Sequence, residues 1–166
     1  MLQPLVRRTW APMGKTPILR SWTRRGRLSV ISALSVSPVR RKCGLYFEIH
    51  EENIRTETVS AFLVRVRRHL RRDLIVVCDR LNAHRSAIDY LRNHFRTAFE
   101  VQWLPAYAPE LNPVEGVWSQ SKYGTLSNFI PNDVDELRSN VIEALGHIRS
   151  RPSMYRSFFR HAELKL

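Results

Sequence analysis

Residues 74–79 read Leu-Ile-Val-Val-Cys-Asp, a continuous apolar run that ends on a carboxylate. An apolar run of this length without polar alternation is typical of a strand buried on both faces, in a sheet covered by helices. An acid at the carboxyl end of such a strand lies at the edge where α/β sheets place their ligands. The stretch therefore predicts an α/β fold and marks Asp79 as a candidate functional residue.

The segments on both sides of this strand carry the spacings of further strands and helices. Apolar residues that alternate with small or polar ones predict strands, and apolar residues three and four apart predict helices. The expected elements are strands over 28–36 and 45–50 paired antiparallel, a helix over 56–72 capped by Thr56, the strand over 74–78, a helix capped by Ser86, a strand over 99–104, a helix capped by Asn112, a helix from Asn132 or Asp133, and a short amphipathic end over 154–159. This order predicts a mixed α/β sheet with helices on its faces.

Length and composition are those of one ordinary globular domain. The chain has 166 residues, of which 43% are hydrophobic and 25% charged. No apolar run approaches the roughly 18–20 residues that span a bilayer, so no membrane is expected among its partners. Two cysteines, Cys43 and Cys78, cannot build a disulfide framework and lack zinc spacing with the histidines. We therefore expect a reducing compartment and no structural zinc.

The charge is strongly uneven along the chain. Residues 1–47 hold ten basic residues and no acidic one, whereas residues 48–166 hold 17 basic and 15 acidic residues. A one-sided basic region predicts a polyanionic partner, with nucleic acid first. A solvated basic surface or a contact with an acidic membrane is the alternative interpretation.

A second acid, Glu115, is expected in the first turn of the helix capped by Asn112. Each acid alone has an ordinary explanation, since Asp79 can cap a turn and Glu115 can favour the helix dipole. Together they can converge on one hard divalent cation, because Mg²⁺ takes one or two carboxylates plus phosphate oxygens. Two such ions about 3.5–4 Å apart clamp a phosphodiester exchange. With the basic charge, this pair predicts a metal-dependent nuclease or strand-transfer enzyme.

Further polar and aromatic residues are candidates for contacts with DNA. Asn82 and His84 closely follow Asp79 and can orient a phosphate or water, although a turn former and a hydrogen-bonded surface group are the ordinary interpretations. Trp10, Trp22 and Tyr107 can stack on bases, with local packing as the alternative. The candidate DNA-binding residues are Arg7, Arg8, Lys15, Arg24, Arg25, Asn82, His84, Arg85 and Lys122.

Two segments resemble the catalytic core of the mariner-related insertion-sequence transposases. They are residues 77–86 (VCDRLNAHRS) and residues 103–118 (WLPAYAPELNPVEGVW). The second contains L-P-x-Y-x-P-x-L-N-P-x-E-x-x-W, which is the specific part of the resemblance. Residues 5–12 (LVRRTWAP) are similar to the segment that follows the family's first catalytic strand, so the resemblance covers about residues 2–150.

The resemblance implies an RNase H-like fold and a triad of two aspartates and a glutamate that binds two Mg²⁺ or Mn²⁺ ions. Asp79 matches the second acid and Glu115 the third. The implied reaction is hydrolysis of a phosphodiester at the element end, followed by attack of the freed 3′-hydroxyl on target DNA. The implied partners are the transposon ends and the target DNA, and the implied location is the bacterial cytoplasm, at the nucleoid.

The chain departs from the family pattern at its beginning. The first catalytic Asp of the family precedes the segment matched by residues 2–5, whereas the first acidic residue of this chain is Glu48. The first catalytic strand and the N-terminal DNA-binding domains thus look absent. We expect residues 1–166 to form a single, partial catalytic domain with a basic N-terminal region over 1–47, as a frameshift product, truncated copy or remnant.

Such a partial domain is expected to bind metal weakly and to cut DNA poorly on its own. Loss of a central strand exposes the unpaired edges of its neighbours, so an upstream transposase fragment or a homo-oligomer is the expected partner. Two other functions stay open at this point. One is a basic DNA-binding module without catalysis, and the other is a different RNase H-like nuclease, for example one that acts on RNA–DNA hybrids.

Overall fold

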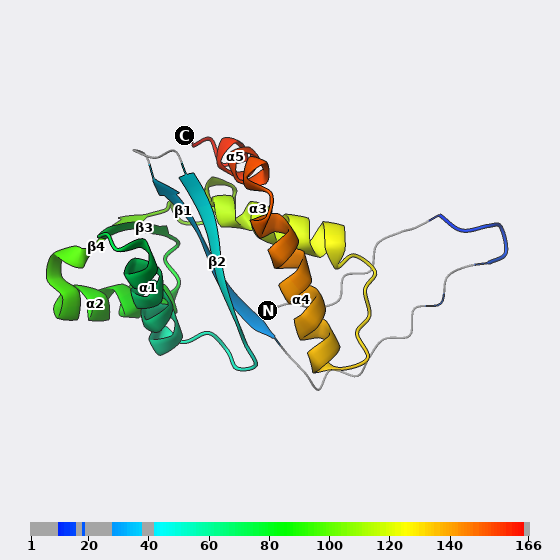
Figure 1. Ribbon diagram of the computed structural model, residues 1–166, viewed down its shortest axis with the longest axis horizontal. Coiled ribbons are helices and arrows are strands. Elements are labelled where there is room, and N and C mark those ends of the chain that lie inside the picture. The colour runs from blue at the N-terminus through cyan, green and yellow to red at the C-terminus, as the bar shows by residue number, and fades with distance from the viewer. Residues whose placement is uncertain (1–9, 16–17, 19–27, 38–41, 165–166) are drawn as a thin grey trace.

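A computed structural model of the chain describes residues 10–15, 18, 28–37 and 42–164 (Figure 1). Its elements are β1 (Ser29–Ser37), β2 (Lys42–His50), α1 (Thr56–Leu70), β3 (Leu74–Cys78), α2 (Asn82–Phe95), η1 (Arg96–Ala98), β4 (Phe99–Trp103), η2 (Pro109–Leu111), α3 (Pro113–Gln120), the π-helical turn η3 (Ser121–Thr125), α4 (Val134–Arg149) and α5 (Pro152–His161). The predicted order of strands and helices is confirmed. The short amphipathic end is α5, a helix of ten residues.

The hairpin of β1 and β2 is the central layer of the molecule. Its antiparallel register runs from Ser29 opposite His50 to Ser37 opposite Lys42, as predicted for these two strands. Because successive side chains of a strand point to opposite faces, the hairpin has two faces to bury. Figure 1 shows it passing between α1 and α2 on one side and α4 and α5 on the other.

Two hydrophobic cores lie on the two faces of this hairpin. The first core joins α3, α4 and α5 to the face that carries Leu34 and Leu45, and the second joins α1, α2, β3 and β4 to the face that carries Ala33 and Tyr46. The fully buried side chains of the first core include Val117, Val141, Leu145, Ile148 and Tyr155, and those of the second include Ala87, Ile88 and Leu91. Both cores therefore depend on one two-stranded layer.

Strands β3 and β4 form a separate parallel pair, with Leu74 opposite Phe99 and Cys78 opposite Trp103. The helix α2 connects them, as parallel strands require a crossover. The predicted mixed α/β architecture is confirmed, but its described strands form two separate pairs instead of one continuous sheet. Within the described part of the chain, β1 pairs only with β2 and β3 only with β4, so each pair keeps one open edge toward the other.

The prediction that residues 74–78 are buried on both faces is also wrong. Ile75 and Val77 are 66% and 54% exposed, whereas Val76 on the opposite face packs against the second core. The physical reason is that α1 and α2 cover one face of this strand only. The apolar sequence of β3 would allow both of its faces to be buried, but the described elements cover only one of them.

Two predicted helix starts are wrong, each for a local reason. Thr56 is the first residue of α1 instead of its cap, and the cap position belongs to Arg55, which makes no side-chain cap bond. Helix α2 begins at Asn82, four residues before Ser86. The chain turns early here because the Asp79 carboxylate accepts the Leu81 backbone N–H at 3.1 Å.

The starts of α3 and α4 agree with the sequence. Asn112 Oδ1 accepts the Val114 N–H at 3.2 Å, and Pro113 takes the first helical position. Asp133 Oδ1 accepts the Glu136 N–H at 2.7 Å and so caps α4. In the described residues, none of these helices is long and apolar enough to cross a bilayer.

Gly116 sets how closely α3 approaches α5. A Cβ atom at this position would lie 2.6 Å from Cδ1 and 2.8 Å from Cγ of Phe158. Gly116→Ala therefore forces the helices or the ring apart, and we expect it to lower the free energy of unfolding by about 1–3 kcal/mol. Urea denaturation followed by circular dichroism measures this loss.

Gly146→Ala is the matched control for this substitution. Gly146 lies in α4 with nothing within 4 Å of the added Cβ, so the methyl group meets no neighbour. Because alanine favours a helix over glycine, we expect this variant to gain up to about 1 kcal/mol. A Gly116→Ala protein as stable as the parent would contradict the close approach of α3 to α5.

Candidate active site

Asp79 directly follows β3 and is fixed by the first turn of α2. Its Oδ1 atom accepts the Leu81 N–H and lies 2.5 Å from Nδ1 of His84. Since a carboxylate only accepts hydrogen bonds, the His84 ring nitrogen is the donor. Both interactions use Oδ1, so as far as the described residues go, Oδ2 is the oxygen left for a further ligand.

The residues after Asp79 lie on α2 and not in a loop as the sequence suggested. His84 is half-buried and faces Asp79, whereas Asn82 and Arg85 are exposed in the first turns of the same helix. The early start of α2 thus places all three near the carboxylate. His84 acts on Asp79 as a positioning group through its hydrogen bond.

Glu115 lies in the first turn of α3 and is exposed. Its backbone N–H donates to the Asn112 carbonyl at 3.0 Å, which belongs to the capped start of this helix. The cap and Pro113 together fix the direction in which α3 leaves the preceding loop. Glu115 therefore sits on a rigid element, as a residue that holds a ligand requires.

The ends of β3 and α3 meet at one cavity of about 300 Å³. Asp79 and His84 line it from one side, and residues 112–114, directly before Glu115, line it from another. The rest of its wall is mainly apolar and comes from β1, α1 and α5. The structure therefore brings the segments of both predicted acids to the same opening, although 35 residues lie between the two acids in the sequence.

The described residues contain no group of three histidine, cysteine, aspartate or glutamate side chains that could hold a metal ion. Glu48, the first acid of the chain, is committed elsewhere. Its Oε1 and Oε2 atoms accept hydrogen bonds from Nε and Nη2 of Arg65 at 2.6 and 2.5 Å. The bidentate pair occupies both oxygens, so Glu48 does not supply a third carboxylate.

The donor set of the site fits a hard cation held by few protein ligands. Mg²⁺ keeps several waters and binds through one or two carboxylates plus phosphate oxygens. The neighbouring thiol does not compete, because burial and the charge of Asp79 raise the pKa of Cys78 to about 11. A thiol with this pKa stays protonated at neutral pH, so it offers no thiolate ligand.

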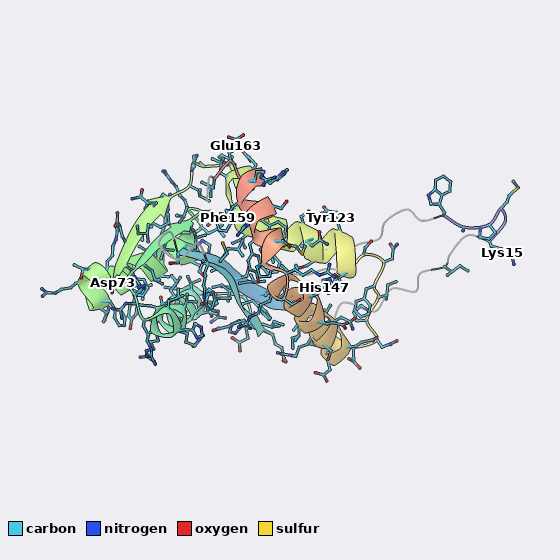
Figure 2. The ribbon with its side chains drawn as sticks, turned by 45° about the horizontal axis from the view of Figure 1, so that its top comes forward. Lys15, Asp73, Tyr123, His147, Phe159 and Glu163 are labelled. Carbon is cyan, nitrogen blue, oxygen red and sulfur yellow. The ribbon has the colours of Figure 1, made fainter. Side chains whose placement is uncertain are left out.

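The predicted DNA-binding residues fall into four groups. Arg7, Arg8, Arg24 and Arg25 lie outside the described residues. Lys15 is exposed and lies away from the body of helices and strands, as Figure 2 shows. Lys122 lies in η3, about two helical turns beyond Glu115. Asn82, His84 and Arg85 lie in the first turns of α2, shortly after Asp79 in the chain.

One polar group at this cavity was not singled out by the sequence. Ser32 of β1 lines the cavity, and its Oγ atom is buried without a hydrogen-bond partner among the described residues. A serine inside an alternating strand carries no signal of its own. Its position became informative only when β1 and β3 were placed on either side of the same opening.

Comparisons with known proteins agree with this geometry. A family model described as DDE superfamily endonuclease matches residues 1–138. The structure is similar to a chain in the crystal structure of the Mos1 strand transfer complex, with a TM-score of 0.64 and 16% identity over 96% of this chain and 48% of that chain. The comparison with curated protein sequences found no match. The likeness confirms the predicted RNase H-like α/β fold, and the chain spans about half the length of the solved one.

Proposed function

The chain belongs to the DDE superfamily of endonucleases, and from this membership we propose that it carries two carboxylates of a metal-dependent site for DNA cleavage and strand transfer. Asp79 is the second acid of that site and Glu115 the third. The observation that carries this proposal is the shared cavity, which is lined by Asp79 at the end of β3 and by the start of α3. Two acids so distant in sequence gain a common ligand only through such an arrangement.

The site residues divide into ligands and positioning groups. Oδ2 of Asp79 and the carboxylate of Glu115 would hold Mg²⁺ or Mn²⁺, and two ions in the complete site. When bound, the metal activates an oxygen nucleophile and neutralises charge on the phosphate. His84 keeps the Asp79 carboxylate in one orientation through the 2.5 Å contact to Oδ1. Asn112 does the equivalent for Glu115 by fixing the first turn of α3.

The substrate in this proposal is DNA, as transposon end and as target. The exposed Asn82 and Arg85 lie on the turn next to Asp79, where a phosphate held by the metal would sit. The basic N-terminal region, with Arg7, Arg8, Lys15, Arg24 and Arg25, adds attraction for the backbone of the nucleic acid. Lys122, in η3 directly after α3, adds one more basic side chain.

We also propose that residues 1–166 act as a single, partial catalytic domain. Two carboxylates on separate elements hold a divalent cation weakly. Region 1–47 contains no aspartate or glutamate that could serve as a third ligand. A further carboxylate would come from an upstream transposase fragment or from a second copy. The chain by itself should therefore bind metal at millimolar rather than micromolar concentration and nick DNA slowly.

Asp79→Asn and Glu115→Gln test the two ligands directly. Each change removes one negative charge at constant shape, and we expect each to weaken Mn²⁺ binding at least about tenfold, or roughly 1.4 kcal/mol. Titration of Mn²⁺ followed by electron paramagnetic resonance measures the free ion. Glu110→Gln is the matched control, because Glu110 is an exposed acid on η2, five residues before Glu115, and should leave the affinity unchanged.

Equal Mn²⁺ affinity in all three variants would contradict the shared site. The proposed weak activity has its own check in a nicking assay on supercoiled DNA with Mn²⁺. Rapid nicking by the 166-residue chain, abolished by Asp79→Ala, would refute the statement that the chain is incomplete. The two outcomes are independent. The Mn²⁺ affinities test which residues are ligands, and the nicking assay tests whether two carboxylates are enough for activity.

A non-catalytic DNA-binding module is the second candidate function. The charge distribution favours it, since ten of the 27 basic residues stand in the first 47 positions without any acid. In that case DNA binding rests on phosphate contacts from this region and needs no metal ion. A metal-dependent nuclease loses its nicking activity in EDTA and on the substitution Glu115→Gln. A non-catalytic module shows no nicking that either change could remove.

Replacing Arg7, Arg8, Arg24 and Arg25 by alanine tests the role of the basic region. We expect the slope of log affinity against log salt to fall by about 0.9 for each arginine that contacts a phosphate. Fluorescence anisotropy with duplex DNA in EDTA measures the slope. Arg138→Ala is the control, because Arg138 is ion-paired with Glu51 at 2.7 Å and should not change it. An unchanged slope in the fourfold variant would remove this region from the DNA interface.

A further inference from the structure

The chain from Leu104 to Asn112 joins the two segments that carry the proposed ligands. At its start, the Leu104 N–H donates to the carbonyl of Cys78, the residue before Asp79, at 2.9 Å. At its end, Asn112 lines the same cavity as Asp79. Both ends of this loop therefore lie at the candidate active site.

Tyr107 stands in the middle of this loop with its side chain in solvent. The residue is 102% exposed, whereas Tyr90 of α2 is 48% exposed and stacks on His94. The sequence allows two interpretations of Tyr107, which are stacking on a base and local packing. Its exposure excludes packing against the described residues, so the ring is free to meet a partner.

The backbone at Tyr107 is strained. Its φ is 58°, in the left-handed region that glycine and asparagine adopt readily and an aromatic residue does not. Arg71, Arg96 and Glu163 also have a positive φ, but each lies at the end of a helix, where such a residue is common. Tyr107 lies in a turn between β4 and η2, so the end of a helix does not explain its conformation. Strain of this kind is typical of residues that hold a ligand.

Two prolines restrict the conformation of the loop. Pro105 and Pro109 stand two residues before and two residues after Tyr107, and each proline fixes its own φ. Beyond them, the Asn112 N–H donates to the Pro109 carbonyl at 3.0 Å. A tyrosine has only two side-chain torsions, so its ring loses little conformational entropy when a flat partner covers it.

We propose that the Tyr107 ring stacks on an unpaired DNA base next to the phosphate at the candidate active site. This inference rests on the proposed function, which puts that phosphate beside Asp79. Tyr107 follows Leu104 by three residues, so their Cα atoms are at most about 11 Å apart. Neighbouring bases of one strand are about 3.4 Å apart along the helix axis. The ring therefore reaches a base within a few nucleotides of the phosphate.

A nucleic-acid base fits this isolated ring better than a protein partner does. Stacking needs one flat face and no pocket, and it tolerates every base. The core of a protein interface is instead a patch of several large apolar side chains, whereas the residues beside Tyr107 are Ala106 and Ala108. The exposed Asn82 and Arg85 can contact the phosphates of the same strand.

The probe is a duplex of about 20 base pairs with a single-stranded tail of about four nucleotides at one 3′ end. In each version of the probe, 2-aminopurine replaces a different base of the tail, and all measurements are made with the full chain in EDTA, so that no cleavage occurs. Stacking quenches the fluorescence of 2-aminopurine. We expect saturable quenching by at least about half at one or two adjacent positions of the tail, because the loop holds the ring at one place.

Substitutions at Tyr107 test whether the ring causes the quenching. Tyr107→Leu keeps an apolar side chain but removes the flat face, so we expect the affinity for the tailed duplex to fall at least about fivefold and the quenching to disappear. Tyr107→Phe and Tyr107→Trp keep a ring and should keep both. Tyr90→Leu is the matched control, because Tyr90 lies on α2 outside the loop and should change neither. Since Tyr107 is fully exposed, its variants should fold, which circular dichroism checks.

Four outcomes would overturn the proposal. The first is the absence of quenching at every position of the tail, and the second is a Tyr107→Leu protein that binds and quenches as the parent does. The third is an equal loss of affinity for a blunt duplex, which would mean that the ring needs no unpaired base. The fourth is a Tyr107→Leu protein that changes from dimer to monomer by light scattering with its quenching intact, since the ring would then contact another protein chain.

Failure of the stacking is distinguishable from failure of the proposed function. The Mn²⁺ affinities of the Asp79→Asn and Glu115→Gln proteins are measured without DNA, and the stacking is measured without metal. Unchanged Mn²⁺ affinities together with quenching that depends on Tyr107 would remove the shared cation site alone. Weakened Mn²⁺ binding without any quenching would remove the stacking alone.

Discussion

The structure depends on one constraint, which is that the β1–β2 hairpin must bury both of its faces. Leu34 opposite Leu45 serves the first core, and Ala33 opposite Tyr46 serves the second. Burial of apolar surface contributes about 25 cal/mol per Å², so a layer that is covered twice contributes from both sides. In the described residues, α3, α4 and α5 pack on no other strand pair, and removal of the hairpin would separate the two cores.

This constraint also relates the two proposed ligands to each other. Asp79 is carried by β3 and α2, which belong to the second core, and Glu115 is carried by α3, which the buried Val117 ties to the first. The segments that carry the two acids therefore reach the same cavity because both cores pack on the same hairpin. Gly116 contributes at this point, since its missing side chain lets α3 lie against Phe158 of α5. A shift of either core would change the distance between the two acids before it changed either acid locally.

The sequence predicted those features that are written in local patterns. The alternation in β1 and β2 gave their pairing, Asn112 gave the start of α3, and Asp133 gave the start of α4. It missed the start of α2, because the bond from Asp79 to the Leu81 N–H competes with the cap expected at Ser86. It predicted burial of Ile75 and Val77 from their character, but burial depends on which elements lie above them.

The candidate site was predictable to a similar extent. The types of residue at Asp79 and Glu115 and the family pattern around them pointed to one cation site, and the structure places their segments at one cavity. The unpartnered Ser32 was not predictable, since its surroundings arise from contacts between strands that are distant in the sequence. Contacts of this kind produce no periodic pattern in the amino-acid sequence.

The most direct test of the shared cation site is paramagnetic broadening by Mn²⁺ in the isotope-labelled full chain, with Mg²⁺ as the diamagnetic reference. At substoichiometric Mn²⁺, the amide signals of residues 79–81 and 113–116 should broaden together, while those in the middle of α4 stay sharp. Broadening at only one of the two segments, or only at the acidic start of α4, would contradict the claim that Asp79 and Glu115 bind the same ion.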